Sequence, residues 1–513
     1  MKYPIGIQNF EDLRLNNYIY IDKTKYIYKL ANEGKYYFLS RPRRFGKSLL
    51  ISTMEAYFQG KKELFDGLAI QKEETEWKSY PILHIDLNTA NFREEDSLYT
   101  LLNDYLCQWE SVYGTRESET TLALRFKGIV ARIAQKEGKG VVILIDEYDK
   151  PILQTLQYPE LQDKHRNMLK AFYSVLKTQD KYIKFAFITG VTKFGKVSVF
   201  SDLNNLTDIS MDNRYVAICG LTEEELATNF KQGIEELAKT YGDTIEETIA
   251  KLRERYDGYH FEEHTIGIYN PFSVLNAMSR KQYKDYWFET GTPTFLVDLL
   301  KMHNYRLQDL TTERVSGDVI NSIDSMSTNP IPAIYQSGYL TITGYDERFK
   351  KYLLGFPNKE VEEGFINFLL PLYSSAGTDS PFIVDEFVHD VETGKPEQFM
   401  QRMKAFFADT SYQVVGNAEL YFQNVMYLVF KMMGFYTQVE RPTSDGRIDA
   451  IIQTADYIYI IECKLDGSAD EALEQIATNH YDAPFAMDKR KLIKIGINFS
   501  SETRGVESWK IEE

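Results

Sequence analysis

The chain has 513 residues, 43% of them hydrophobic and 26% charged, which excludes a collagen-like or disordered protein and leaves room for about three domains. Its formal net charge is −16. A chain this acidic is not expected to coat nucleic acid over its whole surface, so any contact with nucleic acid needs a local basic patch.

The compartment is predicted from the absence of targeting and disulfide patterns. The N-terminus lacks the apolar core of a signal peptide, and no apolar run approaches the ~18 residues of a membrane span. The three cysteines, Cys107, Cys219 and Cys463, lie far apart without a CxxC pair. We therefore expect a cytoplasmic protein with buried free thiols and no membrane contact.

The first ~220 residues alternate short apolar runs with stretches of helical periodicity, the pattern of a parallel α/β sheet. A helix is expected to begin near Leu49, because apolar residues recur there at helical spacing. Continuous apolar runs suit strands that are covered on both faces. Strands are predicted at 36–39, 82–87, 141–145, 185–188 and 216–219.

The remainder of the chain changes character twice. Thr222 and Glu225 form a capping-box pattern, and the sequence is then mostly helical to about residue 345, with a winged-helix arrangement as one interpretation. A turn at 355–358 precedes another helical stretch. A helix at 419–433 leads into strands at 436–440, 448–453 and 457–463. The predicted domains are 1–220, 221–345 and 346–513.

A phosphate-binding loop is predicted where the first strand meets the following helix. Gly46, Lys47 and Ser48 stand at that junction, where backbone N–H groups at a helix N-terminus hold phosphate oxygens. Lys47 would reach the β- and γ-phosphates of ATP, and the Ser48 hydroxyl would ligate Mg²⁺. Arg41 stands where the usual motif has glycine. Arg43 and Arg44 are expected either to touch phosphate or to be solvated loop charges.

A second element completes a nucleotide site. The strand at 141–145 ends in Asp146, expected to hold Mg²⁺, and Glu147, expected to activate water. Thr189, or Thr192, follows another strand and could sense the γ-phosphate. Asp149 is either a supporting acid or, as we favour, a turn residue. The strand at 82–87 intervenes, which fits the branch of P-loop ATPases whose acidic strand is not next to the P-loop strand.

The C-terminal strands carry a separate carboxylate–lysine pattern. Asp449 begins one strand, and Glu462 and Lys464 share one face of the next. A hairpin would place Asp449 beside Glu462, so that both hold Mg²⁺ or Mn²⁺ while Lys464 stabilises the charge that develops on a phosphodiester. Glu419 is a candidate third carboxylate. Gln475 and Tyr481 are candidates for supporting this site or the nucleic-acid backbone.

These segments together resemble bacterial AAA-ATPase-like proteins that are fused to a C-terminal PD-(D/E)XK nuclease-superfamily domain. The resemblance covers nearly the whole chain and rests on RPRRFGKS (41–48), ILIDEYDKP (143–151), ITGVTKF (188–194), YDGY (256–259), NPFS (270–273), YIDKT (20–24) and residues 447–464. It implies that arginine at position 41 is a family trait. It also implies an ASCE-type P-loop fold, Mg-ATP as ligand, a DNA or RNA substrate, and a place near the nucleotide for residues 22–24.

The sequence therefore predicts an ATP-regulated, metal-dependent nuclease. The alternative is an ATP-switched adaptor whose C-terminal domain binds nucleic acid or protein without cutting it. The net charge of −16 favours the adaptor, whereas the intact set of Asp449, Glu462 and Lys464 favours the nuclease. Self-association, or association with another protein, is compatible with either hypothesis.

Overall fold

The computed structural model describes residues 2–193, 200, 203, 205–290, 294–320, 329–373, 380–408, 418–434, 438–440 and 450–513. It divides into two compact units. The first comprises Met1–Thr290 and Glu313–Glu360, and the second comprises Gly291–Thr312 and Val361–Glu513. The chain thus passes from one unit to the other three times.

The first unit is built around a five-stranded parallel sheet in the order β2-β3-β4-β1-β5. Its strands are β1 (Tyr36–Ser40), β2 (Ile82–Asp86), β3 (Val141–Asp146), β4 (Ile183–Gly190) and β5 (Thr207–Asp208). β4 lies between β1 and β3, which confirms that the acidic strand is not next to the P-loop strand. The prediction of a parallel α/β sheet is also confirmed.

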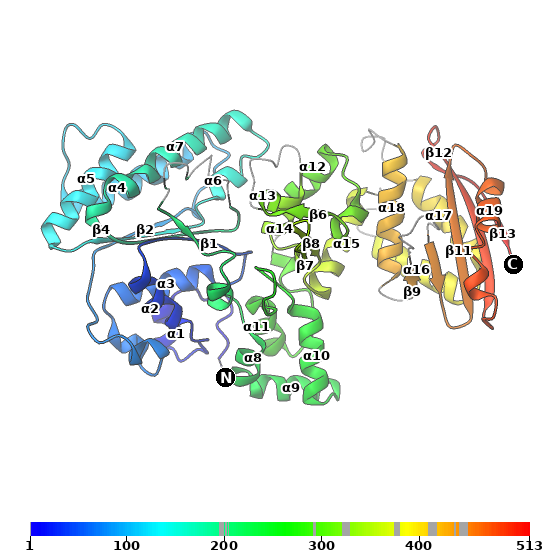
Figure 1. Ribbon diagram of the computed structural model, residues 1–513, viewed down its shortest axis with the longest axis horizontal. Helices are drawn as coiled ribbons and strands as arrows, with labels where there is room; N and C mark the ends of the chain where they lie inside the picture. The colour runs from blue at the N-terminus through cyan, green and yellow to red at the C-terminus, as the bar shows by residue number, and fades with distance from the viewer. Residues whose placement is uncertain are drawn as a thin grey trace. The chain divides into compact units, whose positions relative to one another are not determined.

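Helices cover both faces of this sheet, with α1, α2 and α3 on one side and α4, α5 and α7 on the other (Figure 1). Every residue of β3 is buried, as expected for a strand covered on both faces. The helices are α1 (Phe10–Leu15), α2 (Thr24–Glu33), α3 (Lys47–Phe58), α4 (Ser97–Tyr113), α5 (Leu122–Glu137), α6 (Lys150–Leu153) and α7 (Pro159–Thr178). Short 3₁₀ helices are η1 (Lys62–Phe65), η2 (Ala69–Lys72), η3 (Asp180–Tyr182), η4 (Asn213–Ile218) and η5 (Phe288–Thr290).

The predicted strand at 216–219 is wrong, because η4 and an extended residue, Cys219, occupy that segment. A four-residue apolar run does not distinguish a buried strand from a buried helical turn. The expectation that all cysteines are buried is also wrong, since Cys107 is exposed on α4.

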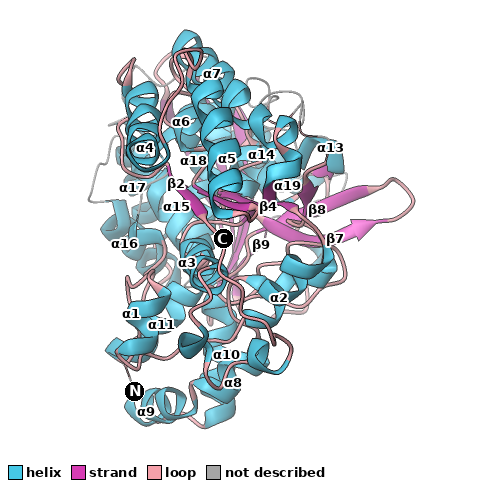
Figure 2. Ribbon diagram, turned by 90° about the vertical axis from the view of Figure 1, so that its left-hand side faces the viewer, coloured by secondary structure: helices cyan, strands magenta, loops and turns pink. Residues whose placement is uncertain are grey.

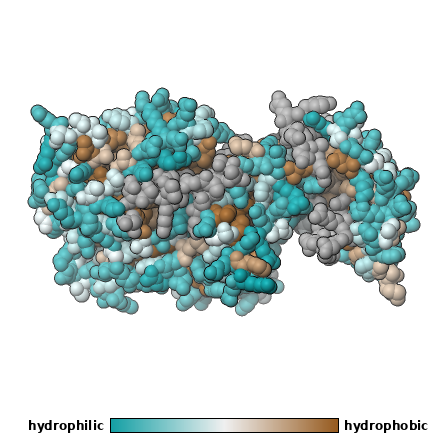
Figure 3. All heavy atoms as spheres, turned by 45° about the horizontal axis from the view of Figure 1, so that its top comes forward, coloured by the Kyte–Doolittle hydropathy of each residue, from teal (hydrophilic) through white to brown (hydrophobic). Residues whose placement is uncertain are grey.

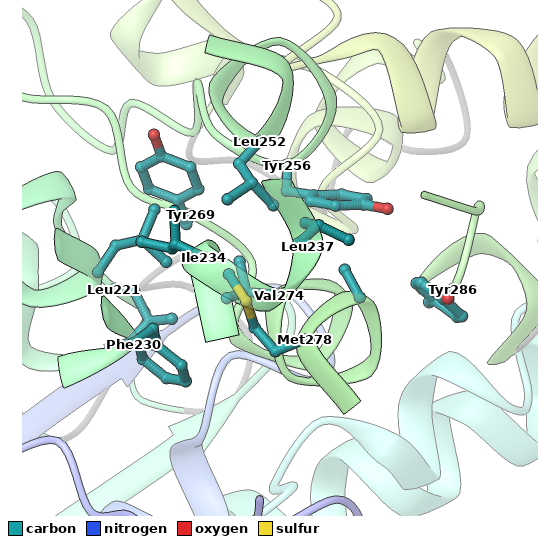
Figure 4. Packing of buried hydrophobic residues seen from close by; sticks show 12 residues of the cluster. Leu221, Phe230, Ile234, Leu237, Leu252, Tyr256, Tyr269, Val274, Met278 and Tyr286 are labelled. Atoms are coloured by element: carbon teal, nitrogen blue, oxygen red, sulfur yellow. The ribbon is translucent and has the colours of Figure 1, made fainter. Parts of the chain in front are cut away.

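A helical part of the same unit has its own core. The helices are α8 (Glu223–Asn229), α9 (Lys231–Tyr241), α10 (Ile245–Tyr256) and α11 (Pro271–Arg280). The predicted capping box is confirmed, with Thr222 and Glu225 bonding each other's backbone N–H groups. Figure 4 shows the side chains that converge between these helices, among them Leu237, Leu252 and Met278.

Three further strands were not predicted. β6 (Arg314–Ser316), β7 (Thr341–Asp346) and β8 (Lys351–Gly355) form an antiparallel sheet in the order β6-β8-β7, accompanied by α13 (Gly317–Ile320) and α14 (Ile331–Gln336). Helical periodicity in the flanking segments and the charged residues at 346–351 masked the strand alternation.

The second unit contains a mixed sheet in the order β13-β12-β11-β10-β9. The strands are β9 (Gln438–Glu440), β10 (Ala450–Gln453), β11 (Tyr457–Leu465), β12 (Lys491–Ser500) and β13 (Gly505–Glu512). Its helices are α12 (Thr294–Met302), α15 (Lys359–Tyr373, which begins in the first unit), α16 (Ser380–Glu392), α17 (Pro396–Ala408), α18 (Ala418–Met433) and α19 (Ala469–Thr478), with η6 (Leu307–Thr311) and η10 (Ala483–Phe485).

The helix predicted at 419–433 is confirmed as α18, and the described parts of the three strands predicted after it are confirmed as β9, β10 and β11. Strands β12 and β13 were not predicted. Helix α19 packs on β11 and β12, and α17 packs on β13. Across the described residues, none of the helices combines the length and apolar content that crossing a membrane requires. The face drawn in Figure 3 carries mainly hydrophilic side chains, with hydrophobic ones scattered among them.

Candidate functional site

The loop between β1 and α3 has the backbone shape of a phosphate-binding loop. Gly46 precedes α3 with a left-handed φ of 93°. A Cβ added to it would meet nothing within 4 Å, so the backbone conformation rather than crowding requires glycine there. The first N–H groups of α3 have no carbonyl partner within the helix and are therefore available to an anion.

Lys47 reaches back across this loop. Its side chain is buried, and its Nζ donates to the carbonyl oxygens of Arg41 at 2.9 Å and Pro42 at 3.1 Å. These carbonyl groups carry no net charge, so they do not neutralise the ammonium group. Ser48 follows Lys47 in the first turn of α3, as the motif predicts.

The acidic end of β3 lies beside the end of β4. Asp146 is buried, and its Oδ1 accepts a hydrogen bond from the Thr189 hydroxyl at 2.5 Å and another from the Glu147 N–H at 3.0 Å. Both bonds end on the same oxygen. The structure thus brings the predicted residues Asp146 and Thr189 together, through the hydroxyl of Thr189.

Glu147 turns out of the strand with a left-handed φ of 52°. Burial raises the pKa of its carboxyl group, and the ammonium groups of Lys47 and Lys150 oppose that rise. Lys150 also forms a 3.7 Å ion pair with Glu147. A half-buried carboxylate with a raised pKa, facing a cation, has the character of a general base.

Asp149 lies in the turn after β3, and its carboxylate joins that turn to the segment after β4. It is buried, and its Oδ2 accepts bonds from the N–H of Thr192 at 2.6 Å and from the Thr192 hydroxyl at 2.5 Å. Burial raises the pKa of Asp149, and the bonds from Thr192 oppose that rise. Since the hydroxyl of Thr192 is engaged by Asp149, Thr189 is the threonine that bonds the Asp146 carboxylate.

The two arginines of the loop lie in different surroundings. Arg44 is exposed at a φ of 66°, with its guanidinium 5.1 Å from the ring centre of Phe272. Arg43 is half-buried, lies 4.8 Å from the ring centre of Trp287 and donates to the Tyr339 hydroxyl at 3.1 Å. Arg44 is therefore the one whose guanidinium is accessible from solvent.

Arg41 has a structural role that the sequence did not reveal. Its guanidinium is buried, donates to the carbonyl oxygens of Ser40 at 2.9 Å and Ser210 at 2.7 Å, and lies 3.9 Å from the ring centre of Phe261. Burial lowers the pKa of this guanidinium to about 10. Arg41 thus holds the start of the loop to segments more than 160 residues away, instead of facing phosphate.

Residues 22–24 form hydrogen bonds with η2 and with Glu225. The Asp22 carboxylate accepts bonds from the N–H groups of Thr24 at 2.9 Å and Ala69 at 2.6 Å. Lys23 is buried, and its Nζ bonds both carboxylate oxygens of Glu225 at 2.6 Å. Glu225 also closes the capping box of α8, so Lys23 ties the N-terminal segment to the helical part.

An apolar pocket adjoins Gly46. Sequence patterns did not indicate it, because its walls come from segments far apart in the chain. The N-terminal segment, α3, the 218–221 segment and α11 contribute to its lining, which includes Ile19, Ile21, Leu49, Leu221 and Leu275.

The C-terminal carboxylate–lysine pair lies on β11. The predicted hairpin is confirmed over the described residues, since Ala450 of β10 pairs antiparallel with Ile461. Glu462 is buried, and its Oε1 lies 3.6 Å from the Nζ of Lys464. Lys464 also donates to the side-chain oxygen of Gln475 on α19. Glu462, Lys464 and Gln475 are therefore brought together.

Within what the structure describes, the other predicted residues of this site are not seen to join this group. Asp449 lies outside the described residues, and Glu419 lies on α18 with its side chain outside them. Tyr481 is largely a core residue, packed with Ile458 and Ile476, and its hydroxyl accepts a bond from Asn479. In the part of the chain that the structure describes, no three His, Cys, Asp or Glu side chains form a metal-binding group.

Comparison with known proteins agrees with this geometry. Residues 4–200 match the family model of predicted AAA-ATPases, and residues 417–509 match that of the PD-(D/E)XK nuclease superfamily. A protein of Azotobacter chroococcum mcd 1, described as an uncharacterized protein in the vnfD 5′ region, is 33% identical over 527 residues, covering 100% of this chain and 99% of its own length. The chain belongs to this family, in which an AAA-ATPase-like segment is joined to a C-terminal segment of the PD-(D/E)XK nuclease superfamily.

Proposed function

We propose that the protein binds and hydrolyses Mg-ATP at the ends of β1, β3 and β4, and that its C-terminal segment is a metal-dependent nuclease. The observation that carries the first part is that the Lys47 loop after β1 and the acidic end of β3 flank the end of β4 at one edge of the sheet, where Thr189 bonds Asp146. Lys47 acts electrostatically on Glu147, which directly follows Asp146. A buried ammonium beside two acids at the C-terminal edge of a parallel sheet is suited to a polyphosphate with its counter-ion.

ATP fits the chemistry of the residues present. Its phosphates would lie against the first turn of α3 and the Lys47 ammonium. Its base would enter the apolar pocket beside Gly46, because a flat aromatic ring gains free energy by leaving water for an apolar site. The hydroxyl of Ser48 and the carboxylate of Asp146 are the hard oxygen donors that Mg²⁺ prefers. Bound magnesium would neutralise charge on the phosphates.

The residues of the chain would divide the work of hydrolysis. Glu147 would take the proton of the attacking water, a role that its raised pKa favours. Thr189 would hold Asp146 in one rotamer through their hydrogen bond. Arg44 is the exposed loop cation that could reach the phosphates.

For the nuclease, Glu462 would be a metal ligand together with Asp449 and Glu419, with Mg²⁺ or Mn²⁺ as the ion. Asp449 directly precedes Ala450, whose partner in the sheet is Ile461, the residue before Glu462. Lys464 would stabilise negative charge on the phosphodiester, with Gln475 fixing its position. The same metal would supply an activated water molecule.

A second candidate is the ATP-switched adaptor that does not cut. It is favoured by the acidity of residues 450–513, in which Asp and Glu outnumber Lys and Arg. Like charge weakens the approach of nucleic acid to this segment.

The nuclease and the adaptor differ in whether the protein cleaves nucleic acid. The full-length protein is incubated with end-labelled single- and double-stranded DNA and RNA, with Mg²⁺ or Mn²⁺ and with or without ATP. The nuclease predicts metal-dependent products that disappear in Glu462→Gln and persist in Glu471→Gln, an exposed acid of α19 that serves as control. Intact substrates under every condition, with ATP hydrolysis preserved, would favour the adaptor.

A further inference from the structure

The hairpin of β7 and β8 projects from the first unit. Figure 2 shows these two strands extending away from the neighbouring helices. A β-bulge interrupts the register between Ile342 and Gly344, and bulges of this kind bend a strand and change where its end points. Tyr345 and Tyr352 face each other across the hairpin with ring centres 4.8 Å apart, which stiffens the stem.

The tip of this hairpin, residues 346–351, is locally basic in a chain of net charge −16. Arg348, Lys350 and Lys351 are all exposed there. Of the two acids in the same segment, Asp346 accepts a 2.8 Å bond from Arg314 of β6, so its charge is compensated. Glu347 is the other. The tip with Arg314 therefore has an excess of positive charge.

An aromatic side chain stands among these cations. Phe349 is 57% exposed, and the guanidinium of Arg348 lies 5.0 Å from its ring centre. The N–H of Phe349 donates to Asp346 at 3.1 Å, which fixes the turn. Exposed aromatic rings interleaved with Lys and Arg are the chemistry that binds the bases and phosphates of nucleic acid.

The tip belongs to an arrangement of helices and strands that resembles a winged helix, and it is the exposed part of that arrangement within the first unit. The order β6, α13, α14, β7, β8, with the sheet order β6-β8-β7, is that of a winged helix whose wing is the β7–β8 hairpin. Helix α14 occupies the place of the helix that enters a nucleic-acid groove in other winged helices. Here it is buried along nearly its whole length. Its Gln336 bonds the carbonyl of Ile320 and the N–H of Lys193. This helix is therefore engaged inside the unit, whereas the wing is not.

We propose that the β7–β8 tip is a nucleic-acid contact, in which Arg348, Lys350 and Lys351 bind backbone phosphates and Phe349 packs against a base. This inference rests on the proposed action on nucleic acid and adds the surface that recruits it. Burial raises the pKa of Tyr352 in the stem, and the acidic residues Glu262 and Glu263 raise it further, so the proposed contact is limited to the tip. The tip supplies the local basic patch that so acidic a chain requires.

The test measures binding separately from cutting. Full-length protein carrying Glu462→Gln is titrated against labelled single-stranded DNA, duplex DNA and RNA by fluorescence anisotropy over a salt series. The hairpin variant adds Arg348→Glu, Lys350→Glu and Lys351→Glu. The matched control adds Lys72→Glu, Lys127→Glu and Lys177→Glu, three exposed lysines elsewhere in the first unit with the same change of charge. A Mg-ATP thermal shift equal to that of the parent shows that each variant is folded.

We expect the hairpin variant to bind at least about tenfold more weakly at low salt and the control to bind nearly as the parent does. Each phosphate contact contributes about −0.9 to the slope of log K against log salt on duplex DNA, so the slope should become shallower by about two to three. Phe349→Ala should lower affinity for single strands by about tenfold and affect duplex DNA less.

Three results would overturn the inference: equal weakening in hairpin and control variants, unchanged binding in the hairpin variant, or no binding by the parent at low salt. The wild-type cleavage assay distinguishes these from failure of the nuclease proposal. The same three charge reversals are also made in the wild type. If that variant still cleaves nucleic acid at the wild-type rate, the tip contact is contradicted but the nuclease proposal is not. Binding lost in the hairpin variant, without cleavage by the wild type, would support the tip contact and contradict the nuclease.

Discussion

The hydroxyl of Thr189 donates a 2.5 Å hydrogen bond to Oδ1 of Asp146, joining the ends of two neighbouring parallel strands. Both side chains are buried. A hydrogen bond to a carboxylate is stronger than one between neutral groups, and it fixes the orientation of the carboxylate. Asp146 therefore presents its other oxygen in a defined direction at the edge of the sheet, where Lys47 and Glu147 also lie.

Thr189→Val should impair ATP hydrolysis more than it impairs folding. Valine keeps the shape but removes the donor, which costs about 1–3 kcal/mol of stability and frees the rotamer of Asp146. We expect roughly a tenfold loss of turnover in a phosphate-release assay. Thr155→Val is the control, because that buried hydroxyl bonds the carbonyl of Pro151, away from Asp146. Equal loss of turnover in both variants would remove Thr189 from the site.

Lys47→Ala should abolish the stabilisation of the protein by Mg-ATP. A ligand at about 100 times its Kd stabilises the folded state by about 2.7 kcal/mol, seen as a higher melting temperature in a thermal-shift assay. The exposed Lys127→Ala is the control and should shift as the wild type does. A normal shift in Lys47→Ala would show that its ammonium does not bind the phosphates.

Glu360 should make the protein less stable as the pH rises. It is fully buried, accepts bonds from the N–H of Trp287 at 2.6 Å and the Ser273 hydroxyl at 2.7 Å, and burial raises its pKa to about 8. The unfolded chain releases this proton near pH 4.5, whereas the folded chain keeps it until about pH 8. The free energy of unfolding should therefore fall between these values, by roughly 3–5 kcal/mol for this group.

Glu360→Gln should remove this dependence, because the amide resembles the protonated acid. Unfolding of both proteins is measured from about pH 5 to about pH 9. Near the acid end the variant and the wild type should be equally stable, and near the alkaline end the variant should be more stable. Glu362→Gln, in the same helix but paired with Lys431 at the surface, should keep the wild-type dependence. If the stability of Glu360→Gln changed with pH as that of the wild type does, Glu360 would not be the group responsible.

Lys464→Ala should lower the rate of nucleic-acid cleavage without unfolding the second unit. It removes the positive charge 3.6 Å from Glu462 and frees Gln475, and the loss of such electrostatic stabilisation costs on the order of 10²-fold in rate. Metal binding, followed by the Mn²⁺-dependent thermal shift, should persist. Lys510→Ala, an exposed lysine of β13, is the control. Cleavage at the wild-type rate by Lys464→Ala would exclude the proposed role.

Local patterns were sufficient for the strands and loops that carry the nucleotide site. Gly46, Lys47, Asp146 and Glu147 each stand at the end of a continuous apolar run or the start of a helix, so a short window of sequence determines their surroundings. The strand at 82–87 indicated that the acidic strand would not lie next to the P-loop strand, but it did not indicate that β4 would separate them. The C-terminal hairpin was predicted because strand alternation puts Glu462 and Lys464 on one face.

Contacts between distant segments could not be predicted in the same way. Arg41 bonds Ser210, Lys23 bonds Glu225, and the pocket beside Gly46 takes its walls from at least four segments. None of these pairs has a local signature, since each arises only when the sheet, the helical part and the N-terminal segment have packed. The β7–β8 hairpin was missed because its charged tip and its bulge interrupt the alternation.

ATP hydrolysis at the end of β3 is tested most directly by comparing phosphate release from Mg-ATP by the wild type and by Glu147→Gln. The amide of glutamine can orient water but cannot accept its proton, and proton transfer of this kind contributes about 10²–10⁴-fold. We predict that Glu147→Gln retains the thermal shift with Mg-ATP and loses at least about a hundredfold in turnover. Turnover at the wild-type rate in this variant, or no phosphate release by the wild-type protein, would contradict it.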